Sequence, residues 1–260
     1  MILSDLHNHT YLCNHANGTV DEYVQMAISK GISIFGFSDH APMNFDTKYR
    51  MTFEQMDKYE NMVKSSAAKY RDKIDVRLGY EVDYISGLVD ERVINRDVDY
   101  FIGSVHFVDK WGFDNPEFIG KYDEMDINLL WKKYFDSIAQ MAQTKQFDIV
   151  GHFDLIKVFK YFPNLEITSL ASDALDAIAD CDMVIELNGA GLRKPVKEAY
   201  PSLSILKEIK KRNIPISFGN DAHEISQVGQ YSSELLSLAK ESGFNSYVTF
   251  SNRKQIVLKF

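Results

Sequence analysis

The sequence predicts an α/β fold in which a parallel sheet closes into a TIM-like barrel of alternating strands and helices. Two observations predict it: seven strand-then-helix units follow one another, and no linker or repeat divides the 260 residues. One domain covering residues 1–260 is long enough to bury a large core. An open doubly wound sheet is the alternative, but the glycine-rich phosphate turn of a dinucleotide fold is absent.

Short runs of aliphatic, β-branched and aromatic residues predict the strands. In chain order these runs are residues 2–6, 32–37, 76–84, 100–105, 147–150, 183–187 and 216–218. Longer amphipathic segments or loops separate them, which is the order expected of parallel strands joined by crossovers. The tail from residue 247 to 260 has no clear assignment.

Capping signals and apolar residues three to four positions apart predict the helices. Thr19 and Glu22 form a capping box that begins the first helix, and Gly31 ends it. Thr52 with Gln55 begins the second in the same way. The segment 125–143 has the clearest apolar stripe, which we interpret as core. The predicted helices are residues 19–31, 52–70, 89–95, 125–143, 169–179, 203–212 and 232–242.

The composition excludes several classes of protein. Acidic residues outnumber basic ones by 37 to 29, so no basic excess exists to displace counterions from nucleic acid or an anionic membrane. No apolar run approaches the ~18 residues that span a bilayer, and residues 1–6 do not resemble a signal peptide. Cys13 and Cys181 fit a reducing interior. We expect a cytoplasmic protein that binds neither nucleic acid nor membrane and, without coiled-coil heptads, is a monomer.

The seven histidines all lie at or just after the ends of predicted strands. The carboxyl ends of barrel strands meet at one mouth, where active sites are built, so we expect these residues to meet there. The histidines and the polar residues that share their positions are His7, His9, His15, Asp39, His40, Glu81, His106, His152, Asn188, Asp221 and His223.

The spacing and chemistry of these residues favour metal binding. His7 and His9 are two residues apart, so both imidazoles point to one face of an extended segment, and Asp221 and His223 repeat the pattern. Imidazole and carboxylate are ligands of Zn, Mn and Fe, and we interpret Cys13 as a bystander. One His-x-His alone is more often structural. Seven histidines at one mouth, without a metal, would leave buried polar atoms unpartnered.

Together these motifs resemble the motif set of the PHP (polymerase and histidinol phosphatase) family. The matching segments are His7-x-His9, His15, Ser38-Asp39-His40, Gly79-x-Glu81, Ser104-x-His106, Gly151-His152 and Asp221-x-His223. The resemblance extends in order from Asp5 to His223, and the combination is highly specific. Asn220 is a departure, because relatives often have Ser before the aspartate, but it lies beside the ligands and should not remove a metal.

The resemblance implies a distorted (β/α)7 barrel that holds three divalent ions, either Zn, Mn or Fe. The implied ligand sets are His7, His9, Glu81 and Asp221 for the first ion; Glu81, as a bridge, with His106 and His152 for the second; and His15, His40 and His223 for the third. Such sets leave open coordination positions, as a catalytic site requires. Glu81 and Asp83 share a face of the third strand, and one of them could support the surroundings of the other by a hydrogen bond.

The resemblance also implies an activity, because the length is similar to that of the family's stand-alone histidinol-phosphate phosphatases. These enzymes hydrolyse L-histidinol phosphate to L-histidinol and phosphate in histidine biosynthesis. Metals in such a site bind phosphate oxygens and lower the pKa of a bridging water, so that hydroxide attacks phosphorus. Asp221, His223 and Asp39 are the candidates for proton handling.

Four more residues are candidates for binding the phosphate ester substrate. Arg193, on the loop after the sixth strand, could make a forked contact with phosphate, and Lys157, after the fifth strand, could add a charge. The alternative for both is a solvated surface cation. Ser104 could add a hydroxyl, and Asn188 ends the sixth strand.

Three other functions stay open at this point. A phosphoesterase of the same fold could act on nucleotides or nucleic-acid ends, although the composition offers little basic groove. A metal-dependent amide or lactone hydrolase also begins with His-x-His but commonly uses fewer ligands. A non-catalytic metal-stabilised module tends to lose ligands, whereas this chain keeps all nine. The sequence identifies neither the metals bound in the cell nor the residues that read the imidazole end of the substrate.

Overall fold

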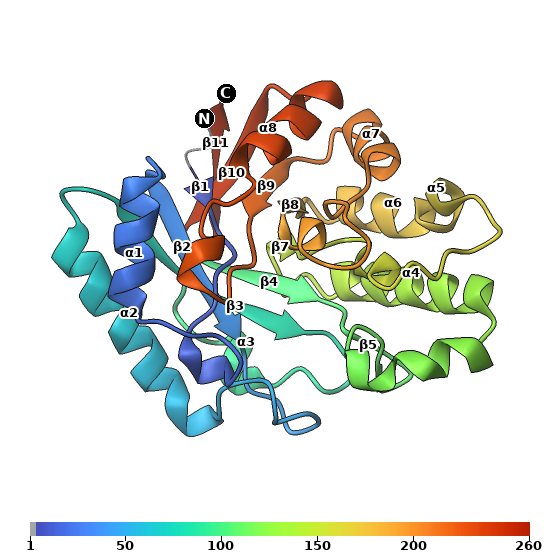
Figure 1. Ribbon diagram of the computed structural model, residues 1–260, viewed down its shortest axis with the longest axis horizontal. Helices are drawn as coiled ribbons and strands as arrows, with labels where there is room; N and C mark the ends of the chain where they lie inside the picture. The colour runs from blue at the N-terminus through green and yellow to red at the C-terminus, as the bar shows by residue number, and fades with distance from the viewer. Residues whose placement is uncertain (1–3) are drawn as a thin grey trace.

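Seven parallel strands form a nearly closed barrel in the computed structural model, which describes residues 4–260 (Figure 1). The strands are β1 (Ser4–Asp5), β2 (Ile34–His40), β3 (Asp75–Asp83), β4 (Tyr100–Ser104), β7 (Ile149–Val150), β8 (Val184–Asn188) and β9 (Ile216–Gly219), in that order around the sheet. The predicted barrel is confirmed, and the open-sheet alternative is wrong. Residues 2 and 3 of the first predicted strand lie outside the described residues.

Backbone hydrogen bonds join the first and last strands and so close the barrel. The Leu6 N–H donates to the Phe218 carbonyl at 2.9 Å, and the His9 N–H donates to the Ala222 carbonyl at 3.0 Å. This seam continues beyond the ends of β1 and β9, into the segments that carry the first and last histidine motifs.

Helices surround the barrel (Figure 1), and the capping box predicted at Thr52 and Gln55 begins a 3₁₀ turn, Phe53–Gln55, that leads into the second helix. They are α1 (Val20–Ser29), α2 (Met56–Tyr70), α3 (Glu91–Ile94), α4 (Ile127–Gln143), α5 (Ile167–Leu170), α6 (Ser172–Asp180), α7 (Leu203–Lys211) and α8 (Ser232–Glu241). Thr19 and Glu22 form the predicted capping box of α1. The helix predicted over residues 169–179 is instead two helices, α5 and α6. From residue 4 onward no helix is long and apolar enough to cross a membrane.

The apolar side chains form two layers, one inside the barrel and one between the strands and the helices. Tyr100 of β4 lies across the barrel interior and donates a hydrogen bond to the Leu6 carbonyl at 2.6 Å. The ring passes over Gly36 and Gly79, where an added Cβ would overlap it. The interior is therefore filled by side chains, and a ligand has access at the carboxyl ends of the strands.

Two antiparallel hairpins escaped the sequence analysis. The C-terminal tail forms β10 (Ser246–Ser251) and β11 (Lys254–Lys259), and β10 adds Val248 and Phe250 to the inner layer. The second hairpin, β5 (Phe107–Val108) with β6 (Trp111–Gly112), leads into a 3₁₀ helix over Pro116–Glu124.

The turn of the β5–β6 hairpin explains why the sequence did not reveal it. Both turn residues, Asp109 and Lys110, have positive φ (50° and 63°). Such turns usually carry Asn-Gly or Asp-Gly, because glycine adopts positive φ without strain. Asp-Lys gives no comparable signal, and strands of two residues show no alternation.

Candidate metal centre

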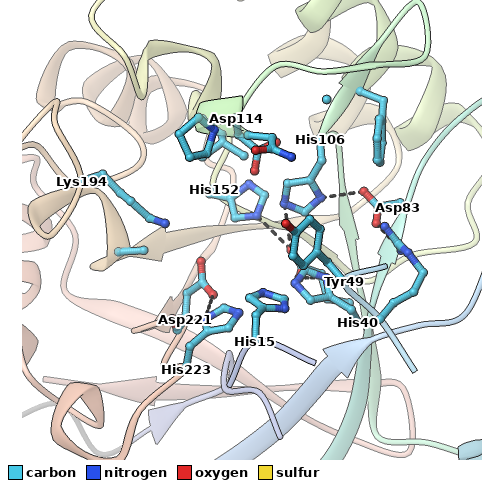
Figure 2. Close-up of a pocket in the computed structure, with 18 of the residues that line it drawn as sticks. His15, His40, Tyr49, Asp83, His106, Asp114, His152, Lys194, Asp221 and His223 are labelled. Atoms are coloured by element: carbon cyan, nitrogen blue, oxygen red, sulfur yellow. Dashed lines mark hydrogen bonds and ion pairs between the residues drawn. The ribbon is translucent and has the colours of Figure 1, made fainter. Parts of the chain in front are cut away.

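A pocket of about 590 Å³ lies at the carboxyl ends of the barrel strands. Figure 2 shows side chains from several of the loops that follow these strands, directed into it. The imidazoles and carboxylates lining it include those of His15, His40, Glu81, His106, His152, Asp221 and His223. His7 and His9 are fully buried within hydrogen-bonding range of these groups. All seven histidines thus gather at one end of the barrel.

The ligand atoms form compact groups, each spanning less than 4.8 Å. Three groups among the described residues are His7, His9 and Glu81; Glu81, His106 and His152; and His15, His40 and His223. A fourth adds the Cys13 thiol to His9 and His223. Burial raises the pKa of the Cys13 thiol above its ordinary range, which disfavours the thiolate that metals bind.

Glu81 of β3 lies between the groups and belongs to two of them. Its Oε1 lies 2.9 Å from Nε2 of His152 and 3.7 Å from Nε2 of His106. Its Oε2 lies 2.9 Å from Nδ1 of His40, 3.4 Å from Nε2 of His7 and 3.7 Å from Nε2 of His9. Each oxygen therefore faces different imidazoles, which is the arrangement of a bridging carboxylate.

Five of the seven histidines hold Nδ1 against an oxygen acceptor. The Nδ1 contacts are His7 with Glu186 (2.8 Å), His9 with Asp39 (3.3 Å), His106 with Asp83 (2.6 Å), His15 with the Cys13 carbonyl (2.8 Å) and His223 with the Asp221 carbonyl (3.1 Å). An acceptor at Nδ1 places the proton there and leaves the Nε2 lone pair free for a metal.

Several other ring nitrogens are buried and have no well-aligned hydrogen bond among residues 4–260. They are Nε2 of His7, His9 and His223 and Nδ1 of His40 and His152. Some lie within 4 Å of a carboxylate oxygen but are not aligned with it for a hydrogen bond. Unpartnered buried polar atoms are costly, and a divalent metal would satisfy them. The imidazole and carboxylate donors therefore fit Zn, Mn or Fe.

The electrostatics favour positive charge around the carboxylates of this centre, whereas burial and the neighbouring histidines lower the pKa values of His15, His40 and His223. Burial opposes ionisation of Glu81 and Asp221, but the surrounding histidines hold the pKa of each carboxyl well below its usual range. Burial opposes protonation of His9, yet the nearby carboxylates of Asp221, Asp39 and Glu81 raise its pKa to about 9. The charge of Asp83 likewise outweighs burial and raises the pKa of His106 to about 10. Protons or metal cations can supply this charge.

The three candidates for proton handling lie in different places. Asp221 and His223 line the pocket, and Asp221 Oδ1 lies 3.1 Å from Nε2 of His9. Asp39 is fully buried and is not part of the pocket lining. Asp39 accepts hydrogen bonds from the His9 ring and the Thr10 hydroxyl, so its position is that of a support behind a ligand.

Of the four substrate-binding candidates, the structure brings only Arg193 to the pocket lining. Its Nη2 donates to the carbonyls of Asn220 (2.7 Å) and Asp221 (2.9 Å), which ties the side chain to the backbone of a ligand segment. Ser104 donates to Glu81 at 2.7 Å, and Asn188 donates to Glu186 at 2.9 Å; both are fully buried.

Lys157 is neither in the pocket nor on the surface. Its Nζ lies 2.9 Å from an Asp154 carboxylate oxygen and donates to Glu198 (2.7 Å) and to the Ala199 carbonyl (2.8 Å). The side chain is 1% exposed. All of these contacts are within the protein, so the charge of Lys157 stabilises the segment after β7 and is not available to a ligand.

Sequence reasoning missed several residues of the centre. Arg50 donates to Asp83 at 2.7 Å and so supports the carboxylate that holds His106. Glu186 contacts His7 from inside the apolar strand β8. An acid within the otherwise apolar run 183–187 was the available signal for Glu186. Lys194 also lines the pocket, beside Arg193.

Known proteins resemble this chain in sequence and in fold. A family model described as "PHP domain" matches residues 5–190. The chain is 38% identical to the "Probable histidinol-phosphatase" of Deinococcus radiodurans, over 97% of this chain and 98% of that protein. It is 31% identical to the "Histidinol-phosphatase" of Bacillus subtilis, over 86% and 95%.

A solved structure has the same fold. It is a histidinol phosphate phosphatase from Lactococcus lactis in complex with Zn, L-histidinol and phosphate. The two chains superpose with a TM-score of 0.79 at 20% sequence identity, over 97% of this chain and 98% of that one. From the family match and the similarity to two histidinol-phosphatases, we conclude that this chain belongs to the PHP domain family.

Proposed function

We propose that this protein is a histidinol-phosphatase, a metal-dependent phosphomonoesterase that hydrolyses L-histidinol phosphate to L-histidinol and phosphate. The main support for metal-dependent hydrolysis is that the imidazole and carboxylate groups meet at one pocket. The substrate is supported by the similarity to two proteins named as histidinol-phosphatases, one of them 38% identical over nearly the full length of both chains.

Three divalent ions match the three donor groups that the resemblance implied. Glu81 and its neighbours would hold two of them, and His15, His40 and His223 would hold the third. Metals held there would neutralise the charge of the phosphate oxygens. They would also lower the pKa of a bound water molecule to near neutrality. Zn, Mn and Fe all accept these ligands, so the donor set is compatible with each.

The chain's own residues would bind the phosphate and manage its protons. Arg193 and Lys194 bring two positive charges to the pocket lining next to Asp221. They would bind phosphate oxygens and stabilise the charge that grows on them. Asp221 and His223 line the pocket and stay our candidates for handling the proton of the leaving alkoxide.

The other side of the pocket suits a small cationic group. Asp46, Asp114 and Glu117 also line the pocket, together with the metal ligands. Figure 2 shows Asp114 beside His106 and His152, on a different side of His152 from Lys194. A volume of about 590 Å³ is in the range of small-molecule sites. Carboxylates here would attract the amine and imidazole of histidinol and repel the further phosphates of a nucleotide.

The test is release of inorganic phosphate by the purified protein reconstituted with Mn or Zn. L-Histidinol phosphate should be strongly preferred over nucleotides and sugar phosphates, and a chelator should abolish its hydrolysis. Equal rates on nucleotides would overturn the substrate while keeping the reaction type. No release from any ester in the presence of Zn, Mn or Fe would overturn the proposal itself.

A further inference from the structure

Glu186 is a buried carboxylate that contacts two metal-binding groups from behind. It lies in β8, is 1% exposed and is not itself a member of any donor group. One oxygen, Oε1, lies 2.8 Å from Nδ1 of His7. The other, Oε2, accepts a hydrogen bond from the backbone N–H of His152 at 2.9 Å. His7 and His152 belong to different donor groups.

The His7 ring lies between two glutamates. Nδ1 faces Glu186, while Nε2 lies 3.4 Å from Glu81 Oε2 and 3.9 Å from Asp221 Oδ1. A carboxylate can only accept a hydrogen bond, so Glu186 selects the tautomer with the proton on Nδ1. In that tautomer the Nε2 lone pair points at the metal-binding side.

His152 depends on Glu186 in a different way. Its φ is +24°, outside the regions that non-glycine residues normally adopt, and such backbone strain needs support from the surroundings. The Nδ1 atom of its ring is buried without a hydrogen-bond partner among the described residues. The hydrogen bond from its backbone N–H to Glu186 therefore holds the backbone from which the ring projects.

The surroundings hold Glu186 in a single position. Asn188, on the same face of β8, donates a hydrogen bond to Oε2 at 2.9 Å. Gly219 of β9 packs against Oε1, and a Cβ at that position would overlap this oxygen and the Cβ of His7. Position 219 therefore requires glycine, because the Glu186 carboxylate occupies the space that a side chain there would fill.

From these contacts we infer that Glu186 is a positioning residue that couples two metal subsites. It fixes the tautomer of His7 in one donor group and the backbone of His152 in the next, so both groups weaken together when this carboxylate is altered. Asp83 is the natural comparison, because it holds only the ring of His106, in the second group.

The Glu186→Ala variant tests this coupling because it removes both carboxylate oxygens. The His7 ring, the backbone N–H of His152 and the Asn188 amide then lose their acceptor together. The tautomer of His7 is no longer selected, and the strained backbone of His152 is no longer anchored.

The readout is the number of metal ions retained per chain in Zn-buffered solution, with Asp83→Ala as the matched control. Loss of a supporting partner typically lowers metal affinity about 10–100-fold. At the free Zn concentration that just saturates the unaltered protein, Glu186→Ala should retain two ions fewer, and Asp83→Ala one ion fewer. Full retention by Glu186→Ala, or loss of only one ion, overturns the coupling. Circular dichroism checks that both variants are folded.

A second measurement on the unaltered protein keeps the inference testable if Glu186→Ala does not fold. Nitrogen-15 chemical shifts of the Zn-loaded protein report the tautomer of each imidazole. His7 should carry its proton on Nδ1, and a proton on Nε2 would overturn the inference. Both readouts concern metal binding alone, so they stand apart from the proposed substrate, whose failure would appear only as missing phosphate release.

Discussion

The histidines of this centre use their two ring nitrogens for different tasks, and His9 is an example. Its Nδ1 lies 3.3 Å from Asp39, whereas its Nε2 lies 3.1 Å from Asp221 in the pocket. Asp39 also accepts from the Thr10 hydroxyl and from the backbone N–H of His40. These contacts place Asp39 among the supports of the ligands.

A variant of Asp39 distinguishes support from proton transfer. Asp39→Asn should weaken metal binding about 10–100-fold, because the amide no longer offers two acceptor oxygens to its neighbours. Excess metal should restore kcat with an unchanged pH profile. Rates measured across pH at increasing Zn or Mn check this. A kcat that stays low at saturating metal would instead assign proton transfer to Asp39.

Removing two ligands at once tests the metal assignment. The double variant His7→Ala with His9→Ala deletes two of the three members of one donor group. Phosphate release should fall to the level of buffer, because the remaining donors are too few to hold an ion. Circular dichroism should still report a folded barrel. Normal turnover by the double variant would contradict the assignment.

At the scale of single elements, local signals predicted the helices better than the strands. The capping box of Thr19 and Glu22 begins α1 as expected, because both partners lie within one turn. In contrast, β2 extends three residues beyond its predicted end, through the polar residues Ser38, Asp39 and His40. Their strand conformation comes from pairing with β3, a long-range interaction that apolar runs do not report.

The capping box allows a quantitative prediction. Thr19→Ala should lower the free energy of unfolding by about 0.5–2 kcal/mol, because the Glu22 N–H loses its acceptor. Ser29→Ala at the exposed end of the same helix is the control and should change stability by less than about 0.5 kcal/mol. Denaturant unfolding of the metal-loaded protein measures both. If Thr19→Ala lowered the free energy of unfolding no more than Ser29→Ala does, the predicted contribution of the cap would be wrong.

At the scale of the whole molecule, the barrel and its histidines were predictable from sequence because each ligand motif follows a strand. The supports of the ligands were not, since the pairs His7–Glu186 and His9–Asp39 join residues far apart in sequence. Lys157 shows the same limit. A lysine after a strand was expected near the pocket, but distant Glu198 holds it elsewhere.

Metal removal should destabilise the entire barrel. The donor groups join ligands from the first strand to the last, and several of their nitrogens are buried without a hydrogen bond. Each independent site stabilises the fold by about 2.7 kcal/mol at a free metal concentration of 100 Kd. Scanning calorimetry should therefore give a clearly lower Tm in EDTA than in excess Zn. An identical Tm in both would show that the metals do not contribute to the fold.

The seam that closes the barrel has a consequence for how the protein is made. His7 and His9 lie on one side of it, Asp221 and His223 on the other, and the third donor group needs His223. The two groups that share Glu81 have all their members by residue 152, much earlier in the chain. As the ribosome extends the chain, the ion of the third group should therefore be captured last. Nascent chains stalled with residues 1–180 or residues 1–250 outside the ribosome would reveal it, because only the longer ones should retain the full complement of Zn.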